Sequence, residues 1–207
     1  MTSQPSPTMV RLIRRAAQLG VPIEPPVAVM ASAYYDLLQR WNEKINLTSL
    51  EDSDEALERL LLEPLAAAAF LPRGIRLVDI GSGGGSPALP LALATGASHL
   101  TMIESRGRKA AFLREALRTL EVSGTVESDR VEALSARVDI ALKADIVSIR
   151  AVRVSSALAS SASSLLASQG QLAFFGRESS PVFPGFEQLE TRSLLPQTFL
   201  HLFRKSR

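Results

Sequence analysis

The sequence predicts an α/β domain built on a doubly wound, mostly parallel sheet, with a helical segment in front of it. From Ile75 onward, short apolar segments of strand length alternate with amphipathic segments of helix length, which is typical of a parallel sheet covered by helices. Before residue 72 the apolar residues follow only the helical period. The first predicted strand runs into a glycine-rich turn and a helix, an arrangement that builds ligand sites in such sheets.

The first 71 residues are expected to form a helical cap on the sheet, behind a disordered tail at residues 1–8. Apolar side chains recur at helical spacing in three segments, and prolines separate the first two segments. Pro64 lies inside the third segment and should kink or split it. The three helices are expected at residues 9–19, 27–40 and 54–71.

Residues 72–207 are expected to form the α/β domain itself. Its last two strands follow a loop rich in proline and glycine, and their pattern is that of an antiparallel pair at the end of the sheet. Strands are expected at residues 75–80, 99–103, 124–128, 144–149, 171–175, 187–192 and 198–203, and helices at 87–95, 106–120 and 153–167.

The glycine-rich turn after the first strand is the clearest candidate site in the chain. Asp79 stands near the end of that strand, and a proline opens the helix beyond the turn. Between them lie Gly81, Gly83 and Gly85 in a G-x-G-x-G pattern. Since glycine has no Cβ and tolerates positive φ, such a turn lets a ligand approach the backbone closely. Ser86 stands where a dinucleotide-binding loop has its third glycine.

The acidic end of the second strand indicates which ligand to expect. Glu104 follows that strand, 23 residues after Gly81, and an acid at this place can accept hydrogen bonds from both hydroxyls of a ribose. A G-x-G-x-G turn with such an acid is typical of enzymes that use S-adenosylmethionine (SAM), which has no pyrophosphate. A plain turn before a helix is the alternative, since glycine loops alone are common. We therefore expect SAM as the cofactor.

Composition excludes several other chemistries. The chain has no cysteine, which removes disulfides, thiolate metal sites and cysteine nucleophiles. Its two histidines, His99 and His201, are too few for a three-histidine metal site; each is expected at the surface, and no metal is expected. No apolar run is long enough to span a membrane, and the N-terminus lacks the pattern of a secretion signal. We expect a cytoplasmic protein that does not contact membranes.

The distribution of charge favours an anionic partner. The net charge is +2 and the isoelectric point is about 9.3. Each group of basic residues taken alone would be a solvated helix face or tail, but beside a nucleotide-type fold the groups together indicate an RNA backbone. The groups are Arg11, Arg14 and Arg15; Arg106, Arg108, Lys109, Arg114 and Arg118; Arg150 and Arg153; and Arg204, Lys205 and Arg207.

A segment outside the glycine turn carries a family resemblance. Residues 41–48, WNEKINLT, would by themselves be a capped helix end with a packed tryptophan, but they resemble the W-N-x-x-x-N-L-T signature of the RsmG (GidB) family. Over roughly residues 27–176 the resemblance continues at Asp79–Pro90, Glu104–Leu113, Arg130–Glu132 and Arg150–Ala151. That family consists of class I SAM-dependent methyltransferases that act on N7 of a guanine in 16S ribosomal RNA. The resemblance implies this fold, SAM as cofactor, and the small ribosomal subunit as partner of a monomer that does not bind DNA.

The resemblance also implies roles for single residues. Gly81 and Gly83 would let the backbone approach the methionine part of SAM, and Glu104 would hold the ribose. Arg150 would stand near both the cofactor and the target base. The implied cofactor site comprises Asp79, Gly81, Gly83, Gly85, Ser86, Glu104, Ser105, Val131, Glu132 and Arg150, with Val131 and Glu132 at the adenine. RNA would meet Asn42, Asn46 and Arg150.

The substrate half departs from the family pattern. Leu60 stands where the family has a histidine, Glu63 follows in place of an aspartate, Ile149 replaces a serine, and Phe175 replaces a lysine. We expect retained SAM affinity with weaker transfer to guanine N7, and recovery of transfer when Leu60→His is combined with Phe175→Lys. Two alternatives stay open: a SAM-dependent methyltransferase of the same fold with another target, either a small molecule or another RNA, and a catalytically inactive descendant that binds SAM or RNA.

The expected chemistry needs no acid–base pair. Guanine N7 carries a free lone pair and no proton, so methyl transfer to it requires positioning and desolvation but no general base. The chain also lacks the N-P-P-Y or D-P-P-Y tetrad with which amine-directed methyltransferases hold an exocyclic amino group; residues 145–148 at the corresponding place read DIVS. No catalytic residue is assigned on this basis.

Overall fold

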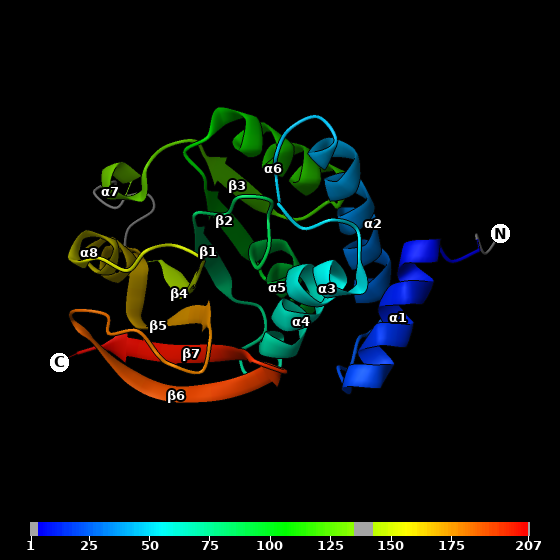
Figure 1. The fold of residues 1–207 in the computed structure, drawn as a ribbon. Coiled ribbons are helices and arrows are strands. Elements are labelled where there is room, and N and C mark those ends of the chain that lie inside the picture. The colour runs from blue at the N-terminus through cyan, green and yellow to red at the C-terminus, as the bar shows by residue number, and fades with distance from the viewer. Residues whose placement is uncertain (1–3, 135–142, 207) are drawn as a thin grey trace.

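The computed structural model describes residues 4–134 and 143–206, and these residues form a sheet flanked by helices (Figure 1). The seven-stranded sheet has the order β3-β2-β1-β4-β5-β7-β6. Neighbouring strands from β3 to β5 are parallel, and β7 is antiparallel to both β5 and β6. The predicted doubly wound sheet with an antiparallel end is confirmed. The strands are β1 Arg76–Ile80, β2 His99–Ile103, β3 Gly124–Glu127, β4 Ala144–Arg150, β5 Leu166–Gly176, β6 Phe186–Leu195 and β7 Thr198–Lys205.

Helices cover both faces of the sheet. Buried side chains of α5 and α6 pack on one face together with the N-terminal helices, and those of α7 and α8 pack on the other. The short helix α7 was not among the predicted elements. The helices are α1 Pro7–Leu19, α2 Pro25–Asn42, α3 Asp54–Leu57, the π-helix η1 Glu58–Leu62, α4 Glu63–Ala68, α5 Ala88–Thr95, α6 Gly107–Thr119, α7 Val131–Leu134 and α8 Ser156–Leu165.

The N-terminal helices share one hydrophobic core with the sheet. Tyr34 and Leu61 of the cap belong to the same buried cluster as Leu89 and Leu113 of the helices on the sheet. In Figure 1, α1 lies on the outside of this layer and α2 lies between α1 and the rest of the molecule. Because the cap has no separate core, the division into residues 1–71 and 72–207 stays a prediction.

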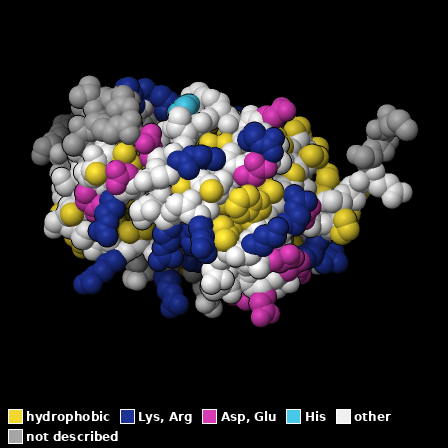
Figure 2. All heavy atoms as spheres, turned by 90° about the horizontal axis from the view of Figure 1, so that it is seen from above, with side chains coloured by type: hydrophobic (Ala, Val, Ile, Leu, Met, Phe, Trp, Pro, Cys, Tyr) yellow, Lys and Arg dark blue, Asp and Glu magenta, His cyan; other side chains and the backbone are white. Residues whose placement is uncertain are grey.

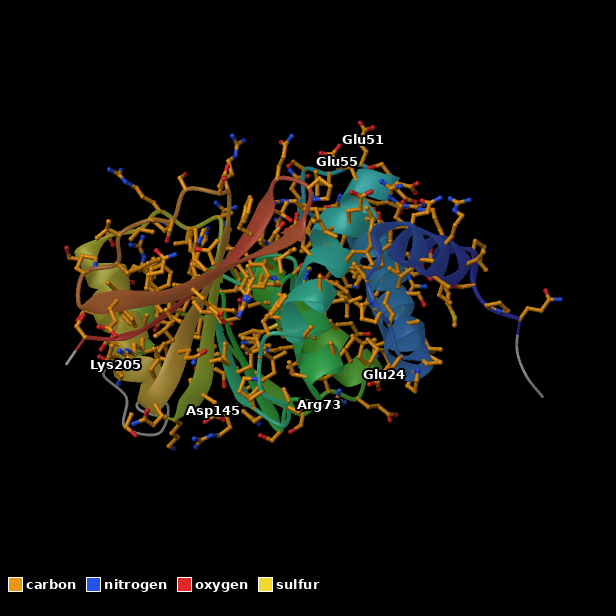
Figure 3. All side chains as sticks on the ribbon, turned by 90° about the horizontal axis from the view of Figure 1, so that it is seen from below. Glu24, Glu51, Glu55, Arg73, Asp145 and Lys205 are labelled. Atoms are coloured by element: carbon orange, nitrogen blue, oxygen red, sulfur yellow. The ribbon has the colours of Figure 1, made fainter. Side chains whose placement is uncertain are left out.

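The predicted extent of the N-terminal tail needs correction. The tail is shorter than the expected residues 1–8, because the Ser6 side chain accepts a hydrogen bond from the Met9 N–H and caps a helix that begins at Pro7. Residues 1–3 of the expected tail lie outside the described residues. At the opposite end of the cap, an exposed ion pair of 3.4 Å joins Glu24 to Arg73 (Figure 3).

Pro64 splits the third cap helix, as predicted. The segment consists of α3, a π-helical turn and α4, and it ends at Ala68. In the turn, the N–H of Glu63 bonds to the carbonyl of Glu58, five residues earlier. Proline has no N–H, so Pro64 cannot bond to the carbonyl of Leu60 or Arg59, four and five residues before it. Each of these two carbonyls therefore lacks one possible donor within the helix, and each can accept a hydrogen bond from elsewhere.

The expectation of a surface histidine at position 201 is wrong. His201 is fully buried, because β7 lies inside the sheet between β5 and β6. Its ring nitrogens find partners there: Nδ1 lies 2.8 Å from Oγ1 of Thr191, and Nε2 lies 2.7 Å from the carbonyl oxygen of Arg177. His99 is half-buried. Among the described residues, no helix is long and apolar enough to cross a membrane.

Candidate cofactor and substrate site

The glycine turn lies at the carboxyl end of β1, where the strand order reverses between β2 and β4. Gly81, Gly83 and Gly85 all have positive φ, at 76°, 53° and 92°. A Cβ on Gly81 would lie 2.9 Å from the side chain of Val152, and a Cβ on Gly85 would lie 2.8 Å from that of Leu89. The conformation thus favours glycine at all three positions, and the space requires it at Gly81 and Gly85.

Glu104 fixes this turn from the end of β2. Its buried carboxylate accepts a hydrogen bond of 2.9 Å from the Gly83 N–H and one of 2.8 Å from the Arg106 N–H. Each carboxylate oxygen has a further lone pair. Glu104 can therefore shape the turn and also accept hydrogen bonds from a ligand's hydroxyls.

A cavity of about 250 Å³ lies beside Glu104 and joins residues that are far apart in the sequence. Four of the predicted cofactor residues line it together: Gly81, Ser105, Val131 and Glu132. The last two belong to α7, which has only four residues and is too short to give a clear periodic signal. The cavity is also lined by Ile80, Ile103, Asp129 and Arg130.

Asp79 offers an unused acceptor beside the turn. The side chain is buried, its Oδ1 accepts a hydrogen bond of 2.5 Å from the hydroxyl of Ser148, and its Oδ2 has no partner among the described residues. Burial raises the pKa of the Asp79 carboxyl, against the opposing effect of the Ser148 hydrogen bond. A buried acceptor without a donor is costly, so this atom suits a cationic or N–H group of a ligand.

Ser86 and Arg150 fasten the glycine turn to the cap. The Ser86 hydroxyl donates a hydrogen bond of 2.6 Å to the carbonyl of Leu60. The guanidinium of Arg150 donates to the carbonyls of Arg59, at 2.6 Å, and of Ser86, at 2.9 Å. The two cap carbonyls are those to which Pro64 offers no donor. Ser86 and Arg150, both predicted cofactor residues, thus lie at the turn. Their hydroxyl and guanidinium groups, however, form hydrogen bonds to the protein itself.

Arg150 is held in place by a buried carboxylate. Its guanidinium lies 3.6 Å from Glu63, and the two side chains are only 8% and 4% exposed. Burial raises the pKa of Glu63 and lowers that of Arg150, while their mutual attraction acts in the opposite direction on each. The next residue, Ala151, has a φ of 56°, a left-handed conformation that is uncommon for alanine and that occurs often at functional sites.

The two predicted RNA-binding asparagines have different surroundings. The side-chain oxygen of Asn42 accepts hydrogen bonds from the N–H groups of Leu47 and Thr48, at 2.8 and 3.0 Å, so Asn42 holds the loop after α2. Asn46 is exposed and lines a second cavity together with Arg106 and other residues at the start of α6. Only Asn46 faces open space.

A larger cleft of about 840 Å³ lies between the π-turn, the end of β5 and the β6–β7 turn. Phenylalanine rings and carboxylates line it, including Glu55, which projects from the outer side of α3 in Figure 3. The sequence did not predict this cleft, because it assembles segments about 120 residues apart. Its lining includes Glu55, Glu58, Arg59, Glu63, Ala151, Phe174, Phe175, Arg177, Glu178 and Phe199.

This geometry agrees with the comparisons to known proteins. A sequence model described as "rRNA small subunit methyltransferase G" (GidB) matches residues 29–180. The chain belongs to the rRNA small subunit methyltransferase G family. The match covers the cap from α2 onward, the glycine turn, Glu104 and all five parallel strands.

Curated members of the rRNA small subunit methyltransferase G family are similar to the chain over part of their length. The proteins of that name from Xylella fastidiosa (strain M23) and Salmonella agona are 40% and 36% identical over 68% and 59% of this chain. The one from Gluconobacter oxydans is 44% identical over 58% of it. The chain spans 64%, 59% and 58% of these relatives, respectively.

Solved structures support the fold. A mutant of MtNAS in complex with S-adenosylmethionine has a TM-score of 0.57 at 14% identity, over 99% of this chain and 100% of that chain. A proposed RNA methyltransferase from Pyrococcus horikoshii has a TM-score of 0.53 at 15% identity, over 85% of this chain and 100% of that chain. The class I methyltransferase fold expected from the sequence is thus confirmed.

Proposed function

We propose that the protein is a SAM-dependent methyltransferase that acts on N7 of a guanine in 16S ribosomal RNA. The observation that carries the proposal is the glycine turn between Asp79 and Glu104 at the switch point of the sheet, in a chain of this family. The protein acts as a cytoplasmic monomer on the small ribosomal subunit.

The residues at the turn fit SAM. The unpartnered Oδ2 of Asp79 would accept a hydrogen bond from the ammonium of the methionine part, and Glu104 would accept those of the ribose hydroxyls. The cavity at Gly81, Ser105 and α7 would hold the adenine. When bound, SAM supplies an electrophilic methyl group.

The chain's own residues position the acceptor and exclude water. Guanine N7 has a lone pair and no proton, so no side chain has to remove one. The base must leave its stack, which RNA loops allow cheaply. The 840 Å³ cleft beside Ala151 would receive it, with the rings of Phe174 and Phe199 for stacking and carboxylates that accept hydrogen bonds from guanine N–H groups.

The test is transfer of labelled methyl from SAM to small subunits of bacteria that lack their own enzyme of this family. We expect label in the ribosomal RNA, and we expect chemical cleavage of that RNA at one N7-methylguanine. Subunits that already carry the mark are the control, and they should accept no label. SAM binding without transfer to subunits or naked ribosomal RNA would contradict the assigned target.

A methyl acceptor of low molecular weight is the alternative that one observation favours. Four carboxylates line the large cleft: Glu55, Glu58, Glu63 and Glu178. They outnumber the two arginines of the lining, Arg59 and Arg177, and this excess of negative charge suits a small cationic substrate. Transfer of label to small molecules of a cell extract, with none to RNA, would support this alternative, and SAM binding without any transfer would support an inactive descendant.

A further inference from the structure

A basic cleft of about 350 Å³ lies between the loop after α2 and the start of α6. Residues 44–46 form one side and residues 106–109 the other, and four of the seven lining residues are Lys or Arg. No Asp or Glu of the described part of the chain lines it. Figure 2 looks down on the side where the α2–α3 loop rises in Figure 1, and Lys and Arg side chains form several groups across this face.

The cations of this cleft lack the acidic partners that arginines elsewhere in the fold have. Arg11, Arg15 and Arg118, for example, each lie within 3.2 Å of a carboxylate oxygen. Within residues 4–134 and 143–206, by contrast, no ion pair involves Lys44, Arg106, Arg108 or Lys109. Uncompensated charge of one sign in a cleft attracts an anion.

The cleft is tied directly to the glycine turn. The carboxylate of Glu104 accepts hydrogen bonds from both Arg106 N–H and Gly83 N–H. On the other side, Lys109 Nζ donates a hydrogen bond of 3.3 Å to the carbonyl of Leu47. An anion in the cleft would therefore lie near the cofactor turn, at the carboxyl edge of the sheet.

The cofactor does not account for four cations at this place. SAM carries a sulfonium, an ammonium and a single carboxylate, and it has no phosphate. The large cleft is lined by four carboxylates and only two arginines, Arg59 and Arg177, so it has no excess of cations to hold phosphate. The two clefts thus differ in sign, and each suits a different part of a nucleotide.

We propose that the basic cleft binds backbone phosphates of the RNA strand whose target base enters the large cleft. This inference rests on the proposed function and deepens it, since it divides the RNA between two surfaces. Lys44, Arg106 and Arg108 contact phosphates, and each contact releases counterions. Lys109 also holds the loop through Leu47, so it contributes both to the charge and to the shape of the cleft.

The test is a triple variant, Lys44→Ala with Arg106→Ala and Arg108→Ala, which spares the structural contact of Lys109. The control removes three exposed charges outside every basic group named above, with Arg73→Ala, Arg76→Ala and Arg192→Ala, whose side chains are 70%, 49% and 49% exposed. Affinity for a labelled stem–loop RNA is measured over a series of KCl concentrations, and SAM affinity is measured by calorimetry.

We expect the slope of log affinity against log salt to fall by about two units in the cleft variant, since each phosphate contact contributes about 0.7 to 0.9. The control should keep the wild-type slope, and both variants should keep their SAM affinity. An equal change of slope in both triple variants, or none in the cleft variant, would overturn the proposal.

Three further outcomes separate the possible failures. Loss of SAM affinity in the cleft variant would assign the cleft to the cofactor and overturn the phosphate site. Weaker binding to whole subunits with an unchanged slope for naked RNA would assign it to a ribosomal protein and also overturn it. A wild-type protein that binds SAM but shows no salt-dependent RNA affinity would overturn both the phosphate site and the RNA target. If that protein transferred methyl to a small molecule, the proposed function itself would be wrong.

Discussion

The hydroxyl of Ser86 donates a hydrogen bond of 2.6 Å to the carbonyl of Leu60, and this contact joins the cofactor turn to the cap. The carbonyl is available because Pro64, four residues further on, has no N–H to offer it. Arg150 uses the neighbouring carbonyl of Arg59 for the same reason. A helix defect in the cap thus provides the acceptors for two residues of the candidate site, in agreement with the frequent occurrence of π-turns at functional sites.

Removing the Ser86 hydroxyl should destabilise the protein measurably. Ser86→Ala leaves the Leu60 carbonyl without its donor, which costs about 1–3 kcal/mol when the group is shielded from water. Urea unfolding measures the change. The matched control is Ser164→Ala, whose hydroxyl makes an exposed hydrogen bond to the carbonyl of Ser160 in α8 and whose loss should change stability by less than about 0.5 kcal/mol. Equal effects of the two substitutions would contradict the role of the Ser86 contact.

Replacing Pro64 should lower the affinity for SAM without lowering the stability of the protein. In Pro64→Ala the new N–H can bond to the Leu60 carbonyl, and a helix gains up to about 3 kcal/mol from such a change. Ser86 then competes for a carbonyl that is already bonded, which offsets part of the gain. We expect stability equal to or above that of the wild type, with SAM affinity reduced several-fold in calorimetry. Unchanged affinity would show that the π-turn does not position the glycine turn; Pro72→Ala, in an exposed segment, is the control.

Loss of the Glu104 carboxylate should weaken both SAM binding and stability. Glu104→Ala removes the acceptor of two backbone N–H groups, and hydrogen bonds to a charged acceptor contribute about 1.5–3 kcal/mol each. We expect at least a tenfold loss of SAM affinity in calorimetry. The exposed Glu121→Ala should leave affinity and stability unchanged. Wild-type affinity in Glu104→Ala would be incompatible with the assigned ribose site.

Asp79 should make stability depend on pH with a defined sign. Burial raises the pKa of its carboxyl above the ordinary value of 3.8, so the native state holds this proton to higher pH than the unfolded state does. Its contribution to stability is complete below pH 3.8 and is lost as the pH rises through the native pKa.

Asp79→Asn removes this contribution and identifies it. Glu63, whose pKa is also raised, remains in both proteins, so the difference between their unfolding free energies as a function of pH isolates Asp79. As the pH rises above 3.8, the wild type should become less stable relative to Asp79→Asn. Over the same range SAM affinity should rise with pH in the wild type only, because an ionised carboxylate is the better acceptor for an ammonium. Parallel curves for the two proteins would refute the assignment.

The combined change of Leu60→His and Phe175→Lys should not restore any activity, contrary to the expectation from the family pattern. The side chains at these positions are only 6% and 3% exposed and belong to the hydrophobic core. A histidine and a lysine there would lose several kcal/mol through desolvation of polar groups. We expect a large fall in the midpoint of thermal unfolding and no gain of methylated RNA. A stable double variant with increased transfer would show that these side chains do reach the substrate.

Local patterns determined the fold and half of the candidate site. The alternation of strand and helix periods, the positive-φ glycines after Asp79 and the acid at the end of β2 are encoded within short segments, and the parallel topology brings the ends of those segments to one edge. The predicted split at Pro64 was local in the same sense, since the missing N–H of proline acts only on its own helix.

Only the tertiary structure determined which residues bond to the split helix at Pro64. Leu60 and Ser86 are 26 residues apart, and Arg59 and Arg150 are 91 apart, yet their hydrogen bonds connect the cap to the cofactor turn. Burial of His201, Leu60 and Phe175 and the difference in charge between the two clefts likewise depend on which elements meet. Periodicity specifies the face of an element that is buried, but the identity of its partners follows from the order in which strands and helices pack, which no single segment contains.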